Sequence, residues 1–124
     1  MKDFSANAQK GEKMLTIDKL REFGANVDEG IARCMGKEDF YLMLVGKVTS
    51  DTRIYQLEKQ LEEKDLGAAF ESAHALKGLC ANLSLVPITK PVSEMTELLR
   101  KKTDTDYTAL MTEAKMQFER LCDL

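Results

Sequence analysis

A single histidine, His74, is the residue whose chemistry stands out in this 124-residue sequence. An imidazole has an ordinary pKa of about 6.5, so a neutral, nucleophilic ring nitrogen is available near neutral pH. A lone histidine is more often a surface or core residue than a functional one, so its neighbours decide the interpretation. On a helix of about 100° per residue, His74 lies at or beyond the edge of the buried face, and Lys77 and Gly78 follow one turn later on the same side.

Lys77 and Gly78 each allow a functional and a structural interpretation. An ammonium three residues from His74 would lie beside the oxygens of a phosphoryl group on the ring, or Lys77 is simply a solvated lysine. A glycine inside a helix costs up to about 1 kcal/mol relative to alanine. Gly78 therefore either clears room for a partner that approaches the imidazole or lets another helix pack closely. The sequence leaves both pairs of alternatives open.

Composition and motifs give little support to other chemistries. The net charge is −3 and no long basic run is present, so we expect no nucleic-acid partner. There is no glycine-rich nucleotide loop and no G-x-S-x-G motif, so we do not expect an enzyme. The three cysteines have no metal-ligand spacing and predict reduced thiols in a cytoplasmic protein without a cofactor. No apolar run approaches the roughly 20 residues of a membrane span, so no membrane partner is expected. Helical bundles of this size are often monomers, and a monomer is expected.

The segment that carries His74 is predicted to be a helix over residues 65–84. Asp65 is suited to cap its start. Apolar residues recur at alternating steps of three and four, which predicts a buried seam that packs in a left-handed bundle. The residues of this seam are Leu66, Ala69, Ala73, Leu76, Cys80 and Leu83.

Similar spacing predicts further helices on both sides of this segment. One runs from Pro87 to Lys102, with Pro91 expected to bend or delay its start, and the last runs from Asp106 to the end. Residues 37–64 form either two helices or one long helix with a polar middle. Two short helices are expected near 16–24 and 28–36, capped by Thr16 and Asp28.

These elements predict an all-α fold. Glycine and proline are few, and no segment alternates with a period of two. We expect an antiparallel up-and-down four-helix bundle with one or two short N-terminal helices. Residues 1–13 are polar with little period and are expected to be a flexible N-terminal arm, and residues 14–124 a single helical bundle domain.

The stretch HALKGLCANL at residues 74–83 resembles the motif of the histidine-containing phosphotransfer (HPt) domain family. That motif has a phospho-accepting histidine, a hydrophobic residue, Lys-Gly, small residues and Asn-Leu. The resemblance extends weakly over residues 17–121. Two positions depart from it, since the family often has Ser or Ala in place of Leu79 and Gly in place of Ser84. These departures affect the expected choice of partner more than the chemistry.

The resemblance implies a phosphorelay intermediate of two-component signal transduction. His74 would accept a phosphoryl group and exchange it with the aspartate of a receiver domain, with Lys77 and Gly78 in supporting positions. The partners would be a response-regulator receiver domain, a hybrid sensor histidine kinase, or both, and Mg²⁺ would be held by the receiver. Phe70 and Ala81 would contribute to docking, although Phe70 is equally well explained as a core residue.

A second function remains open at this stage. The chain could be an HPt-like docking module that binds a receiver or a kinase without relaying phosphate. A variant that removes the imidazole would leave such a docking function intact.

Overall fold

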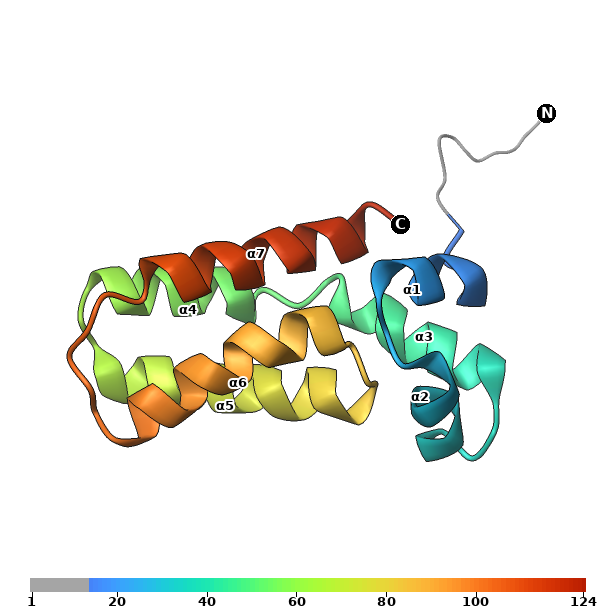
Figure 1. Ribbon diagram of the computed structural model, residues 1–124, viewed down its shortest axis with the longest axis horizontal. Helices are drawn as coiled ribbons and strands as arrows, with labels where there is room; N and C mark the ends of the chain where they lie inside the picture. The colour runs from blue at the N-terminus through green and yellow to red at the C-terminus, as the bar shows by residue number, and fades with distance from the viewer. Residues whose placement is uncertain (1–13) are drawn as a thin grey trace.

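The computed structural model describes residues 14–124, and the expected arm at 1–13 lies outside the described residues. Within 14–124 the chain forms seven helices and no strand, which confirms the predicted all-α class (Figure 1). The helices are α1 (Ile17–Phe23), α2 (Val27–Arg33), α3 (Glu38–Val48), α4 (Arg53–Glu62), α5 (Leu66–Asn82), α6 (Val86–Arg100) and α7 (Thr108–Cys122). None of the helices described there is long and apolar enough to cross a membrane.

Helices α4 to α7 form the bundle, and α1 to α3 gather at one end of it (Figure 1). Short connections at 63–65, 83–85 and 101–107 force successive helices to run antiparallel. Each of α4, α5 and α6 packs on the next helix, and α7 returns to α4 and closes the bundle. The predicted four-helix bundle is therefore confirmed.

The predicted seam of α5 faces the bundle core. Leu66 at the start of the helix is half-buried. The other five residues of the seam are buried, namely Ala69, Ala73, Leu76, Cys80 and Leu83. Similar stripes from α6 and α7, such as Val92, Met95 and Phe118, complete the core. Burial of this apolar surface is the main stabilising contribution to the fold.

The helix ends show where the sequence predicted the local structure correctly. Asp65 caps α5 by accepting a hydrogen bond from the backbone N–H of Ala68, and Thr16 caps α1 in the same way. The second short helix differs, because Asn26 caps α2 and the predicted cap Asp28 lies inside the helix. Asp28 instead forms an ion pair with Arg21.

Two open points about the long helices are also settled. Residues 37–64 form two helices, which are separated by a non-helical connection at 49–52. In this connection Asp51 accepts a hydrogen bond from the backbone N–H of Arg53, the first residue of α4. The two short helices expected before the bundle are α1 and α2, and the longer α3 also precedes it. α6 begins at Val86, so Pro91 does not delay its start and lies buried inside the helix.

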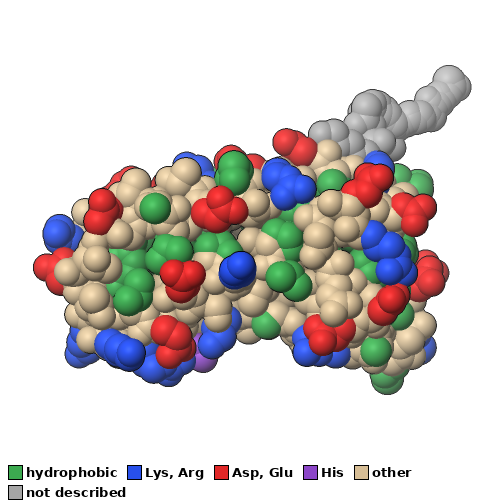
Figure 2. All heavy atoms as spheres, in the orientation of Figure 1, with side chains coloured by type: hydrophobic (Ala, Val, Ile, Leu, Met, Phe, Trp, Pro, Cys, Tyr) green, Lys and Arg blue, Asp and Glu red, His purple; other side chains and the backbone are tan. Residues whose placement is uncertain are grey.

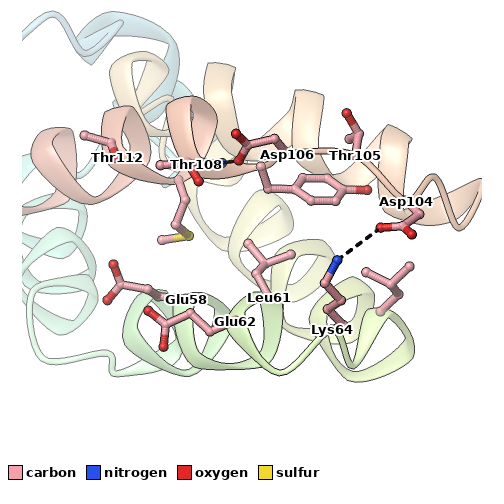
Figure 3. Close-up of a pocket in the computed structure, with 12 residues that line it drawn as sticks. Glu58, Leu61, Glu62, Lys64, Asp104, Thr105, Asp106, Thr108 and Thr112 are labelled. Carbon is pink, nitrogen blue, oxygen red and sulfur yellow. Dashed lines mark hydrogen bonds and ion pairs between the residues drawn. The ribbon is translucent and has the colours of Figure 1, made fainter.

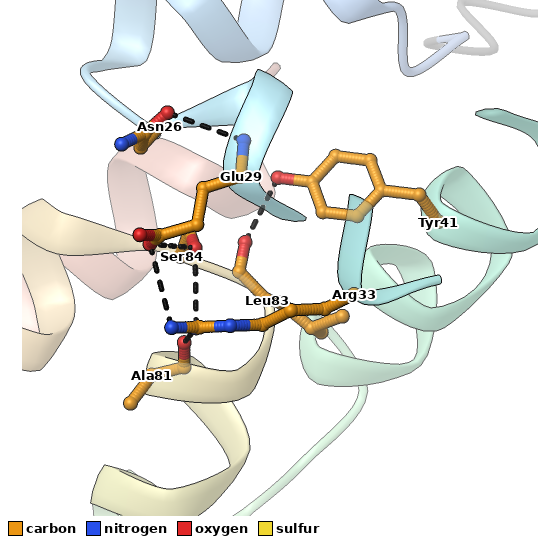
Figure 4. Close-up of polar contacts among 7 residues, drawn as sticks. All are labelled: Asn26, Glu29, Arg33, Tyr41, Ala81, Leu83 and Ser84. Carbon is orange, nitrogen blue, oxygen red and sulfur yellow. Dashed lines mark hydrogen bonds and ion pairs between the residues drawn. The ribbon is translucent and has the colours of Figure 1, made fainter. Parts of the chain in front are cut away.

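Polar contacts fasten α2 to the end of α5 (Figure 4). Arg33 donates hydrogen bonds to the backbone carbonyl of Ala81 and to the hydroxyl of Ser84, the latter at 3.4 Å. The same hydroxyl donates to a carboxylate oxygen of Glu29 at 2.6 Å. These contacts place α2 beside the last turn of the helix that carries His74.

Ser84 explains one departure from the family motif. Its φ of 56° is left-handed, a conformation that favours glycine, and it ends α5. The backbone N–H of Leu85 donates to the carbonyl of Cys80 across this turn, at 2.9 Å. A serine is accommodated here because its hydroxyl gains the contacts to α2 that a glycine would lack.

Tyr41 of α3 makes a second attachment to the same helix end. Its buried hydroxyl donates to the backbone carbonyl of Leu83 at 2.9 Å, and burial raises the pKa of Tyr41 to about 12. Gly30 of α2 gives the Tyr41 ring its space, because a Cβ there would meet the ring and would lie 2.9 Å from the carbonyl oxygen of Leu83. The close approach of α2, α3 and α5 therefore requires a glycine at this position.

Candidate functional site

His74 lies on the solvent-exposed side of α5, opposite the buried seam. The residue after it, Ala75, is also exposed, and Gly78 follows one turn later on the same side. Figure 2 shows the histidine at the molecular surface, at the edge of the view and next to basic side chains. A partner protein can therefore reach the imidazole without any change in the helix.

The imidazole of His74 stacks on the ring of Phe70, one turn earlier in α5. The ring centroids lie 5.5 Å apart and the ring planes differ by 15°. Phe70 is half-buried and packs against the core, so it is both a core residue and a neighbour of the histidine. The two interpretations of Phe70 are therefore compatible, and the stack restricts the orientation of the imidazole.

A carboxylate on α6 links two cations, one of which lies over the Phe70 ring. Glu97 of α6 forms ion pairs with Lys77 at 3.7 Å and with Arg100 at 3.5 Å. The Arg100 guanidinium carbon lies 5.2 Å from the centroid of the Phe70 ring. Ion pairs between exposed groups contribute only about 0–1 kcal/mol, so small movements of these side chains cost little.

Lys77 is therefore neither a free solvated lysine nor directly paired with His74. Its side chain is 33% exposed, and its ion pair joins α5 to α6. The sequence did not indicate Glu97 or Arg100 as neighbours of His74, because only the packing of α6 on α5 brings them there. The helical spacing of α6 places Glu97 and Arg100 near each other on that helix. It does not show that they face His74, because that depends on the register between α5 and α6.

Gly78 is exposed, and a Cβ built there would meet no atom within 4 Å. Close helix packing within the described chain therefore does not explain this glycine, and that alternative is wrong. Gly30 provides the contrast, since its missing Cβ is needed for packing. A side chain at position 78 would instead project into open space on the side of α5 that carries His74.

Ala81 lies two turns beyond His74 and is half-buried. Its carbonyl accepts the hydrogen bond from Arg33, so this end of the surface adjoins α2. Leu79, the other departure from the motif, is half-buried and packs against the core. Its larger side chain therefore fills space in the bundle and leaves the imidazole exposed.

The thiols and carboxylates of the described region do not form a second reactive centre. Cys34 and Cys80 are buried, and burial raises the pKa of the Cys80 thiol to about 12. A thiol with such a pKa is a poor nucleophile near neutral pH. Across residues 14–124, no group of three or more His, Cys, Asp or Glu side chains is placed to hold a metal ion.

A cleft of about 500 Å³ lies between α4, the first residue of α5, the loop before α7, and α7 itself (Figure 3). Its lining includes Leu61, Tyr107 and Met111, with Lys64 and Asp104 paired across one side at 3.7 Å. None of His74, Lys77 and Gly78 lines it. The exposed face of α5 is therefore a separate site from the cleft.

Comparison with known proteins identifies the family of this chain. The family model of the Hpt domain matches residues 47–123, which is more than half of the chain and includes all four helices of the bundle. The chain belongs to the Hpt domain family, whose members take part in histidine phosphotransfer and interact with receiver domains or kinases of two-component systems. No curated protein sequence and no solved structure matches the chain.

Proposed function

We propose that the chain is a phosphorelay intermediate that accepts a phosphoryl group on His74 and exchanges it with the aspartate of a receiver domain. The observation that carries this proposal is the exposed imidazole on α5, stacked on Phe70, with open space above Gly78. An unobstructed imidazole of fixed orientation suits in-line transfer, which depends mainly on positioning and on stabilisation of charge.

The transfer step needs only one nucleophile from this chain. An unprotonated ring nitrogen of His74 attacks the phosphorus of the receiver's aspartyl phosphate. The N–P bond forms as the O–P bond breaks, and the aspartate carboxylate leaves with the bonding electron pair. The reverse step returns the phosphoryl group, so the chain is a carrier and not an enzyme with its own turnover. Mg²⁺ on the receiver would neutralise charge on the phosphoryl oxygens.

Lys77 and Gly78 support this step in different ways. The Lys77 ammonium lies one turn from His74 and can turn from Glu97 towards the phosphoryl oxygens, because its present ion pair is weak. Gly78 leaves room for the receiver's active-site loops above the helix. Phe70 and Ala81, on either side of His74 along α5, would form part of the docking surface.

We propose that residues 14–124 act as one unit in this role. The contacts of Arg33 and Tyr41 with the end of α5 tie the N-terminal helices to the bundle. The receiver would therefore meet α5 together with the adjoining surface of α2. We further propose that the chain acts as a monomer in the cytoplasm, with its only partners a receiver domain, a sensor kinase, or both.

The proposal is tested by mixing the purified chain with a panel of phosphorylated receiver domains from the same organism. We expect acid-labile, alkali-stable label on the wild type and none on His74→Gln, while both proteins have the same helical content. Tight binding to a receiver without label would instead favour a docking module. Absence of both label and binding would contradict the phosphorelay proposal and the docking alternative together.

A further inference from the structure

Glu97 pairs with two cations, Lys77 on the helix of His74 and Arg100 on its own helix. The same carboxylate oxygen is 3.7 Å from the Lys77 ammonium and 3.5 Å from Nε of Arg100. Arg100 also lies over the Phe70 ring, and the same ring stacks on the imidazole of His74. One carboxylate is therefore shared by two cations, one of them three residues from His74 on α5 and the other over the ring that stacks on His74.

We infer that Glu97 is a positioning residue that competes with a phosphoryl group on His74 for Lys77 and Arg100, and so limits how strongly the chain retains that group. This inference rests on the proposed function of His74. Without a phosphoryl group, Glu97 is the partner of both cations. With one, about two further negative charges attract the same two cations.

The ion pairs have the properties that such a competition requires. The side chains of Glu97, Lys77 and Arg100 are 53%, 33% and 48% exposed, so water screens the pairs and the cations can exchange partners. A relay intermediate has to release its phosphoryl group to one protein after accepting it from another. A carboxylate that weakens retention favours release to the next protein.

The test uses phosphoramidate as the phosphoryl donor, so that no partner protein is needed. The P–N bond of phosphoramidate breaks, ammonia leaves, and the N–P bond to His74 forms. At a fixed phosphoramidate concentration, we expect Glu97→Gln to raise the ratio of phosphorylated to unphosphorylated chain about two- to fivefold, and to lengthen the lifetime of the adduct. Glu97→Asp, which keeps the charge, should stay near the wild-type ratio.

Glu94→Gln is the matched control. Glu94 is exposed one turn earlier on α6, and it makes no ion pair within the described part of the chain. The same loss of charge there should leave the ratio unchanged. In a background that also carries Lys77→Ala and Arg100→Ala, Glu97→Gln should have little further effect, because the cations for which it competes are gone.

The outcomes separate this inference from the proposed function. A wild-type chain that is phosphorylated on His74, with an equal or lower ratio in Glu97→Gln, would overturn the role of Glu97 and leave the relay intact. Equal increases in Glu97→Gln and Glu94→Gln would also overturn it, because net charge would then be the cause. A wild-type chain that forms no phosphohistidine would overturn the proposed function and this inference together.

Discussion

The imidazole of His74 lies almost parallel to the ring of Phe70, with 5.5 Å between the ring centroids. Because Phe70 packs against the core of the bundle, the stack ties an exposed and otherwise mobile side chain to a rigid part of the fold. A nucleophile whose orientation is restricted before the partner arrives loses less entropy when it reacts.

Phe70→Leu should slow phosphorylation of His74 while the fold survives. Leucine keeps most of the apolar volume but cannot stack on the imidazole. Since aromatic pairs contribute about 0.5–1.5 kcal/mol, we expect a loss of about two- to tenfold in the rate constant with phosphoramidate. Tyr55→Leu is the control, because Tyr55 packs edge-on against Phe118 and lies on α4. Equal rates for Phe70→Leu and wild type would remove the stack from the mechanism.

Gly78→Ala should make the protein more stable and a poorer relay. The new methyl group meets no atom within 4 Å, and alanine is favoured over glycine inside a helix by up to about 1 kcal/mol. Transfer from a phosphorylated receiver should nevertheless slow, and Gly78→Leu, which adds more bulk, should block it. The measurements are urea unfolding and single-turnover transfer.

Gly46→Ala is the matched control for this trade of stability against function. Gly46 lies inside α3, and a Cβ there also meets nothing within 4 Å. The substitution should increase stability similarly and leave transfer unchanged. If Gly78→Leu transfers at the wild-type rate, Gly78 does not serve to clear space for the partner.

Lys77→Ala should slow phosphoryl transfer by about tenfold, because a charge-assisted hydrogen bond to the phosphoryl group is lost. Its effect on unfolding should be small, since the pair with Glu97 is partly exposed. Lys115→Ala is closely matched, because Lys115 is also 33% exposed and pairs with a glutamate, Glu58, on another helix. The account of Lys77 fails if both variants transfer at the wild-type rate.

The buried thiol of Cys80 predicts how stability depends on alkaline pH. Burial raises its pKa from 9.0 to about 12, so the folded protein holds a proton that the unfolded chain releases near pH 9. Stability from this group is fully present below pH 9 and is lost as the pH rises towards 12. The free energy of unfolding should therefore fall less steeply with pH in Cys80→Ala over this range. Urea unfolding at several pH values measures this, and identical slopes would contradict it.

The local features of the site were predictable from the sequence, because they depend on helical periodicity alone. The seam of α5, the cap at Asp65 and the shared side of His74 and Gly78 all follow from the spacing of residues in one segment. Alternatives that depend on the environment of a side chain stayed open. Only the structure shows that Gly78 faces open space and that Phe70 has both a buried side and a histidine partner.

Features that depend on contacts between segments could not be predicted. Glu97 and Arg100 reach the site only through the register of α6 on α5, which helical periodicity does not determine. The cap of α2 was misplaced by two residues, because Asn26 and Asp28 are both good capping residues and local sequence does not choose between them. The left-handed serine at Ser84 is stabilised by Arg33 and Glu29, which are distant in sequence.

The most direct test of the central claim is the site of phosphorylation itself. The chain has one histidine, so a phosphorus–proton NMR correlation to imidazole ring protons after phosphoryl transfer from a receiver identifies His74 without ambiguity. We predict that the wild type shows this correlation and that His74→Gln shows no bound phosphorus signal. A wild-type chain that binds a phosphorylated receiver but shows no phosphorus on the imidazole, or shows it on another side chain, would contradict the account.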